Sequence, residues 1–132
     1  MENNQENGKI LICGTISSER DMLKSILEKA NYINIFESES GPEAVEAYKS
    51  NVPDVVFVDI EMSQMSGLDT LVHLKMIDKN ACVIMMSTLS QQEQVIEALQ
   101  AGAADFIMKP FRENDVLETI AKRCQRKVLW KE

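Results

Sequence analysis

Three side chains that could do chemistry together each follow a short strand-like run. Asp59 ends the run 55–58, Ser87 ends the run 81–86, and Lys109 comes directly after the run 105–108. A carboxylate can act as a nucleophile toward a phosphoryl group and become an acyl phosphate. A hydroxyl and an ammonium can then hold two phosphoryl oxygens by charge-assisted hydrogen bonds. The residue types therefore predict phosphoryl-transfer chemistry, provided that the three side chains meet in the fold.

The elements that must position these side chains alternate between strand-like runs and helical periodicity. The expected strands cover residues 9–13, 32–38, 54–59, 81–87 and 105–108, and the expected helices begin near Ser18, Ser40, Gly67, Ser90 and Asn114. Short strands joined by helical crossovers run parallel and are covered by helices on both faces. The pattern predicts an α/β fold with a five-stranded, doubly wound parallel sheet. In such a sheet the carboxyl ends of strands one, three, four and five lie close together.

Several helix boundaries have recognisable capping signals. Ser18 with Asp21 is expected to cap the first helix, and Ser40 with Glu43 forms a capping box that has proline in the first turn. A second capping box is expected at residues 90–93, and Gly102 is expected to end the helix that follows. The last helix is expected to begin at about Asn114.

Composition limits the classes of protein. The chain has a net charge of −7, which disfavours nucleic acid as a partner, and it has no apolar run long enough to insert into a membrane. We expect a flexible arm at residues 1–8 and one domain at residues 9–132. Three widely spaced cysteines (Cys13, Cys82 and Cys124) favour buried thiols in a reducing compartment over a disulfide framework, and hence a cytoplasmic location.

Two segments carry a resemblance to a known family. DVVFVDIEMSQMSGLDTL (residues 54–71) and QQEQVIEALQAGAADFIMKPF (residues 91–111) resemble the receiver domains of bacterial response regulators, and within them the CheY-like chemotaxis regulators. The resemblance covers residues 9–126 and implies the flavodoxin-like (βα)5 fold. It implies that Asp59 is the phosphoacceptor. It also implies roles in phosphoryl binding and switching for Ser87, its neighbour Thr88, the aromatic Phe106, and Lys109, whose peptide bond to Pro110 is cis in the family.

The chain departs from the family pattern at the end of the first strand. Gly14 and Thr15 stand where the family has two acidic residues that help to hold Mg²⁺. Asp59 and Glu61 are the most that remains as metal ligands, so no cofactor is firmly expected. Glu19 is expected to serve the helix dipole instead. Ser63 replaces a proline of the family and is expected to loosen the loop that follows Asp59.

The resemblance leaves two functions open. In the first, a histidine kinase phosphorylates Asp59, and the face built by the fourth helix, fifth strand and fifth helix signals to a downstream protein, with chemotaxis as one pathway. The chain is then no enzyme beyond assisting its own phosphoryl transfer. In the second, it is a pseudo-receiver that signals through protein contact without Mg²⁺-dependent phosphorylation. A flavin-binding protein of similar topology is a remote third option, because the segment 14–18 offers hydroxyls to a phosphate group.

Overall fold

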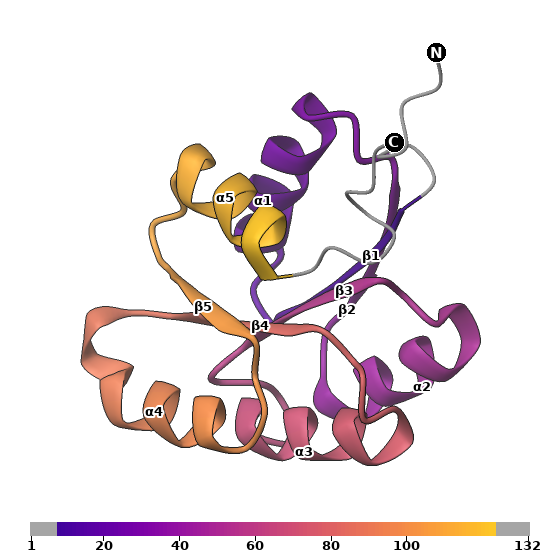
Figure 1. The fold of residues 1–132 in the computed structure, drawn as a ribbon, viewed down its shortest axis with the longest axis vertical. Coiled ribbons are helices and arrows are strands. Elements are labelled where there is room, and N and C mark those ends of the chain that lie inside the picture. The colour runs from indigo at the N-terminus through magenta and orange to yellow at the C-terminus, as the bar shows by residue number, and fades with distance from the viewer. Residues whose placement is uncertain (1–7, 124–132) are drawn as a thin grey trace.

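The computed structural model describes residues 8–123, and its centre is one five-stranded parallel sheet (Figure 1). The strands are β1 (Lys9–Cys13), β2 (Asn34–Ser38), β3 (Val55–Asp59), β4 (Val83–Ser87) and β5 (Asp105–Met108). They are ordered β2-β1-β3-β4-β5, so β3 lies in the middle of the sheet. Every residue of β3 and β4 is buried, which fits runs that are apolar on both faces.

Helices cover both faces of this sheet. They are α1 (Ser17–Lys29), α2 (Gly41–Asn51), α3 (Gly67–Ile77), α4 (Gln92–Gln100) and α5 (Glu113–Arg123), with a 3-10 turn, η2 (Leu89–Gln91), before α4. Helices α1 and α5 lie on one face, and α2, α3 and α4 lie on the other (Figure 1). The predicted doubly wound α/β fold is therefore confirmed.

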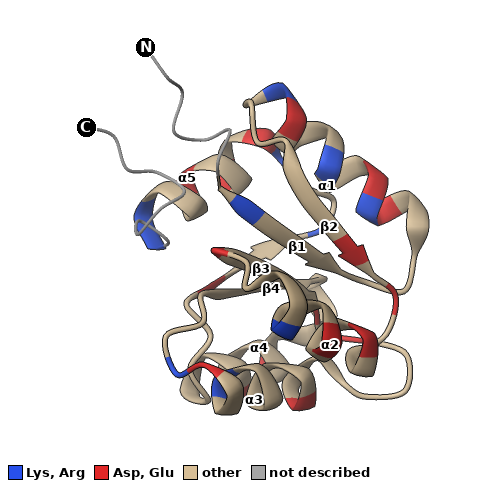
Figure 2. Cartoon of the chain, turned by 90° about the vertical axis from the view of Figure 1, so that its right-hand side faces the viewer, with Lys and Arg blue, Asp and Glu red and all other residues tan. Residues whose placement is uncertain are grey.

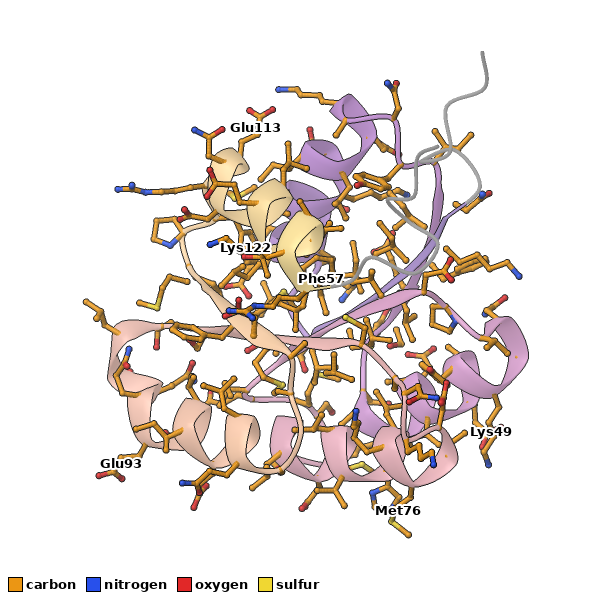
Figure 3. The ribbon with its side chains drawn as sticks, viewed as in Figure 1. Lys49, Phe57, Met76, Glu93, Glu113 and Lys122 are labelled. Atoms are coloured by element: carbon orange, nitrogen blue, oxygen red, sulfur yellow. The ribbon has the colours of Figure 1, made fainter. Side chains whose placement is uncertain are left out.

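Each face of the sheet has its own apolar core. Phe57 belongs to the core under α1 and α5, whereas its neighbours Val56 and Val58 belong to the core under the other three helices. In Figure 3, Phe57 lies in the interior, while Met76 and Glu93 project outward from the α3 and α4 layer. Charged residues lie mostly on helices and loops, and the strands carry few of them (Figure 2). Successive side chains of β3 thus point to opposite faces of the sheet, so this one strand packs against both layers of helices.

The helix starts differ from the expected ones in two places. Helix α1 begins at Ser17 after Ile16, with no side-chain cap, so the expected cap by Ser18 is wrong. The box before α4 lies two residues earlier than expected, because Thr88 and Gln91 cap η2 reciprocally. Ser40 caps α2 by accepting a hydrogen bond from the N–H of Glu43, as expected. Gly102 has a φ of +113° and follows α4, as its expected role as a helix stop requires.

The three cysteines do not share one environment. Cys13 is a buried thiol, and burial raises its pKa to about 12. Cys82 is disulfide-bonded, so the expectation of free thiols is wrong for this residue. Spacing in the sequence carries no information on whether two sulfur atoms meet in the fold. Residues 1–7 of the expected arm at 1–8, together with Cys124 and the rest of the tail, lie outside the described residues.

Candidate functional site

The site is centred on an ion pair between the ends of two strands. Lys109 Nζ donates a hydrogen bond to Asp59 Oδ2 at 2.7 Å, across fifty positions of sequence. Asp59 is the last residue of β3 and is only 4% exposed. Lys109 follows β5, where its backbone N–H donates to the carbonyl of Ser87 and its peptide bond to Pro110 is cis. The sheet thus brings together the acid and the amine that the sequence analysis singled out.

Burial and pairing act in opposite directions on these two groups. Burial raises the pKa of Asp59, and the hydrogen bond from Lys109 offsets that rise only in part. Burial also disfavours the ammonium of Lys109, but hydrogen bonds to Asp59 and Glu19 outweigh it and leave its pKa raised. Lys109 is therefore a cation at neutral pH, held beside a carboxylate that has lost much of its hydration.

Glu19 is a third member of the site. Its Oε1 accepts a second hydrogen bond from Lys109 Nζ, at 2.9 Å. Glu19 lies in the first turn of α1, as expected. The expectation that it serves only the helix dipole missed its contact with Lys109. The signal that could have found it is its place just after the β1–α1 loop, which lies at the same edge of the sheet as Asp59.

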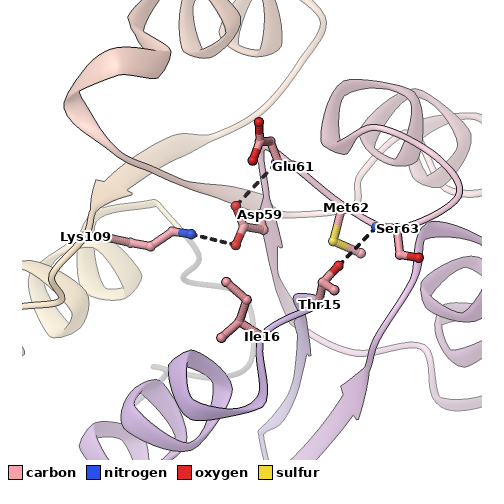
Figure 4. A pocket seen from close by; sticks show the side chains of 7 residues that line it. All are labelled: Thr15, Ile16, Asp59, Glu61, Met62, Ser63 and Lys109. Atoms are coloured by element: carbon pink, nitrogen blue, oxygen red, sulfur yellow. Dashed lines mark hydrogen bonds and ion pairs between the residues drawn. The ribbon is translucent and has the colours of Figure 1, made fainter.

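An open pocket of about 300 Å³ lies in front of Asp59 and Lys109 (Figure 4). Its lining residues come from three loops at the carboxyl edge of the sheet, and they are Thr15, Ile16, Asp59, Glu61, Met62, Ser63 and Lys109. The backbone N–H of Glu61 donates to Asp59 Oδ1 at 3.3 Å, while the Glu61 side chain is exposed at the rim. The volume is ample for a phosphoryl group, and the pocket offers a carboxylate and an ammonium to it.

The other predicted site residues lie nearby with different contacts. The Ser87 hydroxyl is fully buried and lies 3.8 Å from Met108 Sδ, so in this structure it does not join the Asp59–Lys109 pair. Thr88 caps η2 and lines a second cavity next to Lys109. Phe106 is half-buried on β5 and packs against the core under α2, α3 and α4. Of the three groups that were expected to meet, Asp59 and Lys109 are in contact, and the Ser87 hydroxyl is bonded elsewhere.

The two loop positions that lack acidic residues have distinct environments. A Cβ added to Gly14 would lie 3.9 Å from Asp59 Oδ2, in ordinary contact, so this position adjoins the site without offering it a ligand. Thr15 Oγ1 accepts a hydrogen bond from the N–H of Ser63 at 3.0 Å (Figure 4). The Ser63 carbonyl accepts another from the N–H of Gly41. Both backbone groups of Ser63 are thus hydrogen-bonded, which tells against the expected looser loop, and the N–H that a proline would lack provides one of the two bonds.

These residues do not fit the Mg²⁺ ion that the family resemblance implies. Mg²⁺ needs oxygen ligands in near-octahedral geometry. Here Asp59 Oδ2 is engaged by Lys109, the Glu19 carboxylate is engaged by the same ammonium, and the Thr15 hydroxyl accepts from Ser63. Among residues 8–123, no group of three or more His, Cys, Asp or Glu side chains is arranged to hold a metal ion.

Comparisons with known proteins confirm the family that the sequence resembles. The family model for the response regulator receiver domain matches residues 10–121. The chemotaxis protein CheY of Bacillus subtilis (strain 168) is 46% identical over 114 residues, which is 86% of this chain and 95% of CheY. CheY of Thermotoga maritima is 45% identical, with the same coverage.

Solved structures give the same result. A CheX–CheY–BeF3–Mg²⁺ complex from Borrelia burgdorferi contains a chain that matches with a TM-score of 0.82 and 32% identity, covering 87% of each chain. The receiver domain of NtrX from Brucella abortus matches with a TM-score of 0.82 and 26% identity, covering 86% of this chain and 96% of that one. The chain therefore belongs to the response regulator receiver family of two-component signal transduction, and within that family it is CheY-like.

Proposed function

We propose that Asp59 is the phosphoacceptor of this receiver and that a histidine kinase is its donor. The observation that carries the proposal is the 2.7 Å contact between Lys109 Nζ and a carboxylate that is 4% exposed beside an open pocket. A carboxylate oxygen of Asp59 attacks the phosphorus, the phosphorus–nitrogen bond of the phosphohistidine breaks, and its electron pair returns to the imidazole. Lys109 keeps its proton and binds an oxygen of the transferred group.

The proposal includes a route by which the modified site signals. The Ser87 hydroxyl turns from Met108 to the phosphoryl group, and Thr88 leaves room over the site. Phe106 changes its packing on β5, and the altered face of α4, β5 and α5 contacts a downstream protein. A cavity of about 220 Å³ supports this face as a contact surface, because Phe106 and residues of β5 and α5 line it.

The remaining features of the proposal follow from this role. The chain accepts one phosphoryl group and assists that transfer, but it does not turn over a substrate. Its net charge of −7 disfavours nucleic acid as the downstream partner. Chemotaxis is the proposed pathway because the chemotaxis proteins CheY of Bacillus subtilis and Thermotoga maritima are 46% and 45% identical to this chain.

Within residues 8–123, no helix is both long and apolar enough to cross a membrane. We place the protein in the cytoplasm without membrane insertion, because the phosphoryl group of a histidine kinase comes from ATP inside the cell. The disulfide at Cys82 is the observation against this location, since disulfides are rare in reducing compartments. Cell fractionation tests the location directly.

A second function is favoured by the donor set at the site. Gly14 and Thr15 offer no carboxylate to the site. Of the other acids near Asp59, Glu61 is exposed at the rim and Glu19 is hydrogen-bonded to Lys109. A pseudo-receiver would keep the fold and the contact face and would signal without becoming phosphorylated.

Intact mass measurement separates the two functions. The protein is incubated with acetyl phosphate, with and without Mg²⁺, and in parallel with a histidine kinase from the same organism. The receiver function predicts a gain of one phosphoryl group that is absent in Asp59→Asn. No gain from either donor contradicts the receiver function and supports the pseudo-receiver.

A further inference from the structure

We propose that Glu19 positions the ammonium group of Lys109 and in this way helps to order the site around Asp59. The proposal rests on the receiver function, because it concerns the lysine that binds the transferred group. Lys109 Nζ lies 2.7 Å from Asp59 Oδ2 and 2.9 Å from Glu19 Oε1, so the ammonium is fixed by two carboxylates.

The contact with Glu19 anchors the lysine from a rigid element. Glu19 lies in the first turn of α1, and its backbone N–H donates to the carbonyl of Ile16. Among residues 8–123, Lys109 is the one ion-pair partner of Glu19. The Glu19 side chain is 33% exposed, while that of Lys109 is 13% exposed. A helix-borne carboxylate at the rim therefore reaches inward to a largely buried ammonium.

A lysine needs such an anchor more than other cations do. Its four-carbon stem has many rotamers, and each ordered rotamer costs entropy. When a phosphoryl group is added to Asp59, the contact of Lys109 with Oδ2 must be exchanged for one with a phosphoryl oxygen. The contact with Glu19 persists through that exchange, so Lys109 stays within reach of the new oxygen.

A purely structural ion pair between α1 and the β5–α5 loop is the alternative. A partly exposed pair of this kind contributes little to stability. The loop is already held by a hydrogen bond from the Lys109 N–H to the Ser87 carbonyl, and α1 is held by the buried side chains of Leu23 and Leu27. If Glu19 positions Lys109, loss of the Glu19 carboxylate changes the order of the ammonium group and the rate of phosphoryl transfer. If the ion pair is purely structural, the loss changes stability alone.

The test compares Glu19→Gln, which keeps an oxygen acceptor, with Glu19→Ala, which removes it. Both variants lose the negative charge, so the difference between them reports the contact. The first readout is the ¹H–¹⁵N signal of the Lys109 ammonium, assigned by its loss in Lys109→Arg. The signal should be seen in the wild type and in Glu19→Gln, and it should be lost to solvent exchange in Glu19→Ala.

The second readout is the rate of acyl phosphate formation at saturating acetyl phosphate. We expect Glu19→Ala to react about tenfold more slowly than Glu19→Gln, because the lysine that binds the transferred group is displaced. The acetyl phosphate concentration that gives half the maximal rate should change less than the maximal rate itself. Glu46→Gln and Glu46→Ala are the matched controls, since Glu46 is an exposed carboxylate paired with another lysine, Lys49, and lines neither pocket beside Lys109. These two should agree with each other within about twofold.

Three results would overturn the proposal. They are an ammonium signal that persists in Glu19→Ala, its absence from the wild type, and equal rates in Glu19→Gln and Glu19→Ala. If no protein, including the wild type, forms an acyl phosphate, the receiver function fails, and the ammonium signal alone still decides whether Glu19 positions Lys109.

Discussion

The hydroxyl of Thr15 accepts a hydrogen bond from the backbone N–H of Ser63, which joins the loop after β1 to the loop after β3 (Figure 4). Ser63 also pairs with Ser40 in an isolated parallel bridge. Three loops at the carboxyl edge of the sheet are therefore connected through one residue. The two departures from the family pattern at positions 15 and 63 are in direct contact, so the effects of changing them should depend on each other.

The first prediction concerns this hydrogen bond. Thr15→Val removes the acceptor while keeping the shape of the side chain. We expect the free energy of unfolding to fall by about 1 kcal/mol, the usual contribution of one such bond. We also expect faster amide hydrogen exchange at Ser63. Thr15→Ser keeps a hydroxyl and should behave as the wild type in urea denaturation and in exchange; protection of the Ser63 amide that survives Thr15→Val would contradict the assignment.

The second prediction restores the acids. A Cβ at Gly14 would meet nothing closer than 3.8 Å, and it would lie 3.9 Å from Asp59 Oδ2. Gly14→Asp combined with Thr15→Asp should therefore fold and create an oxygen-rich site for Mg²⁺. We expect the double variant to bind Mg²⁺ at least about tenfold more tightly than the wild type by calorimetry. It should also unfold at a higher temperature when Mg²⁺ is added.

The control for this gain is Gly14→Asn with Thr15→Asn, which matches the size without the charge. Unchanged Mg²⁺ affinity in the Asp variant would mean that the end of β1 does not face Asp59 in solution.

The third prediction tests how tightly the backbone packs behind the phosphoacceptor. A Cβ added to Gly67 would clash with the carbonyl oxygen of Asp59 and would lie 2.7 Å from that of Ile60. Backbone atoms cannot move aside cheaply, so Gly67→Ala should cost about 1–3 kcal/mol of unfolding free energy. It should also slow phosphorylation by shifting Asp59. Gly14→Ala adds a methyl group that makes only ordinary contacts, so its free energy of unfolding should fall much less in the same denaturation experiment.

The sequence predicted the fold well because its signals were local and agreed with one another. The bounds of β1 and β5 were as expected, and apolar runs identified the buried β3 and β4. The predicted start of β2, at residue 32, was two residues too early, because Tyr32 is buried in the core without belonging to the strand. An apolar residue that packs from a turn has the same pattern as one in a strand.

The site was predicted less completely, for a different reason. Asp59 and Lys109 were identified because each directly follows a strand of the sheet. The contact of Glu19 with Lys109 and that of Thr15 with Ser63 depend on side chains that span two loops. Positions along one chain do not show which loops face each other or how far a side chain reaches. Such contacts were therefore accessible only from the folded structure.

The fourth prediction concerns stability in acid. The hydrogen bond from Arg20 Nε to Glu37 Oε1 at 2.9 Å holds the pKa of Glu37 below its usual value, and Arg20 is itself 8% exposed. Since the folded state prefers the carboxylate more than the unfolded state does, this pair contributes stability above the ordinary pKa of glutamate. That contribution is lost as pH falls through the lower pKa of the folded state.

Glu37→Gln should therefore be less stable than the wild type near pH 7, and the gap should narrow as pH falls below about 4.5, the usual range for a glutamate. Because the side chain of Glu37 is 29% exposed, the difference at neutral pH should stay near or below about 1 kcal/mol. Urea denaturation at several pH values between neutrality and acid measures it. Glu46→Gln, which removes the carboxylate of an exposed pair with Lys49, is the control for the loss of a surface carboxylate. A gap between Glu37→Gln and the wild type that stays constant with pH would show that the Arg20 contact acts through packing and not through the charge of the carboxylate.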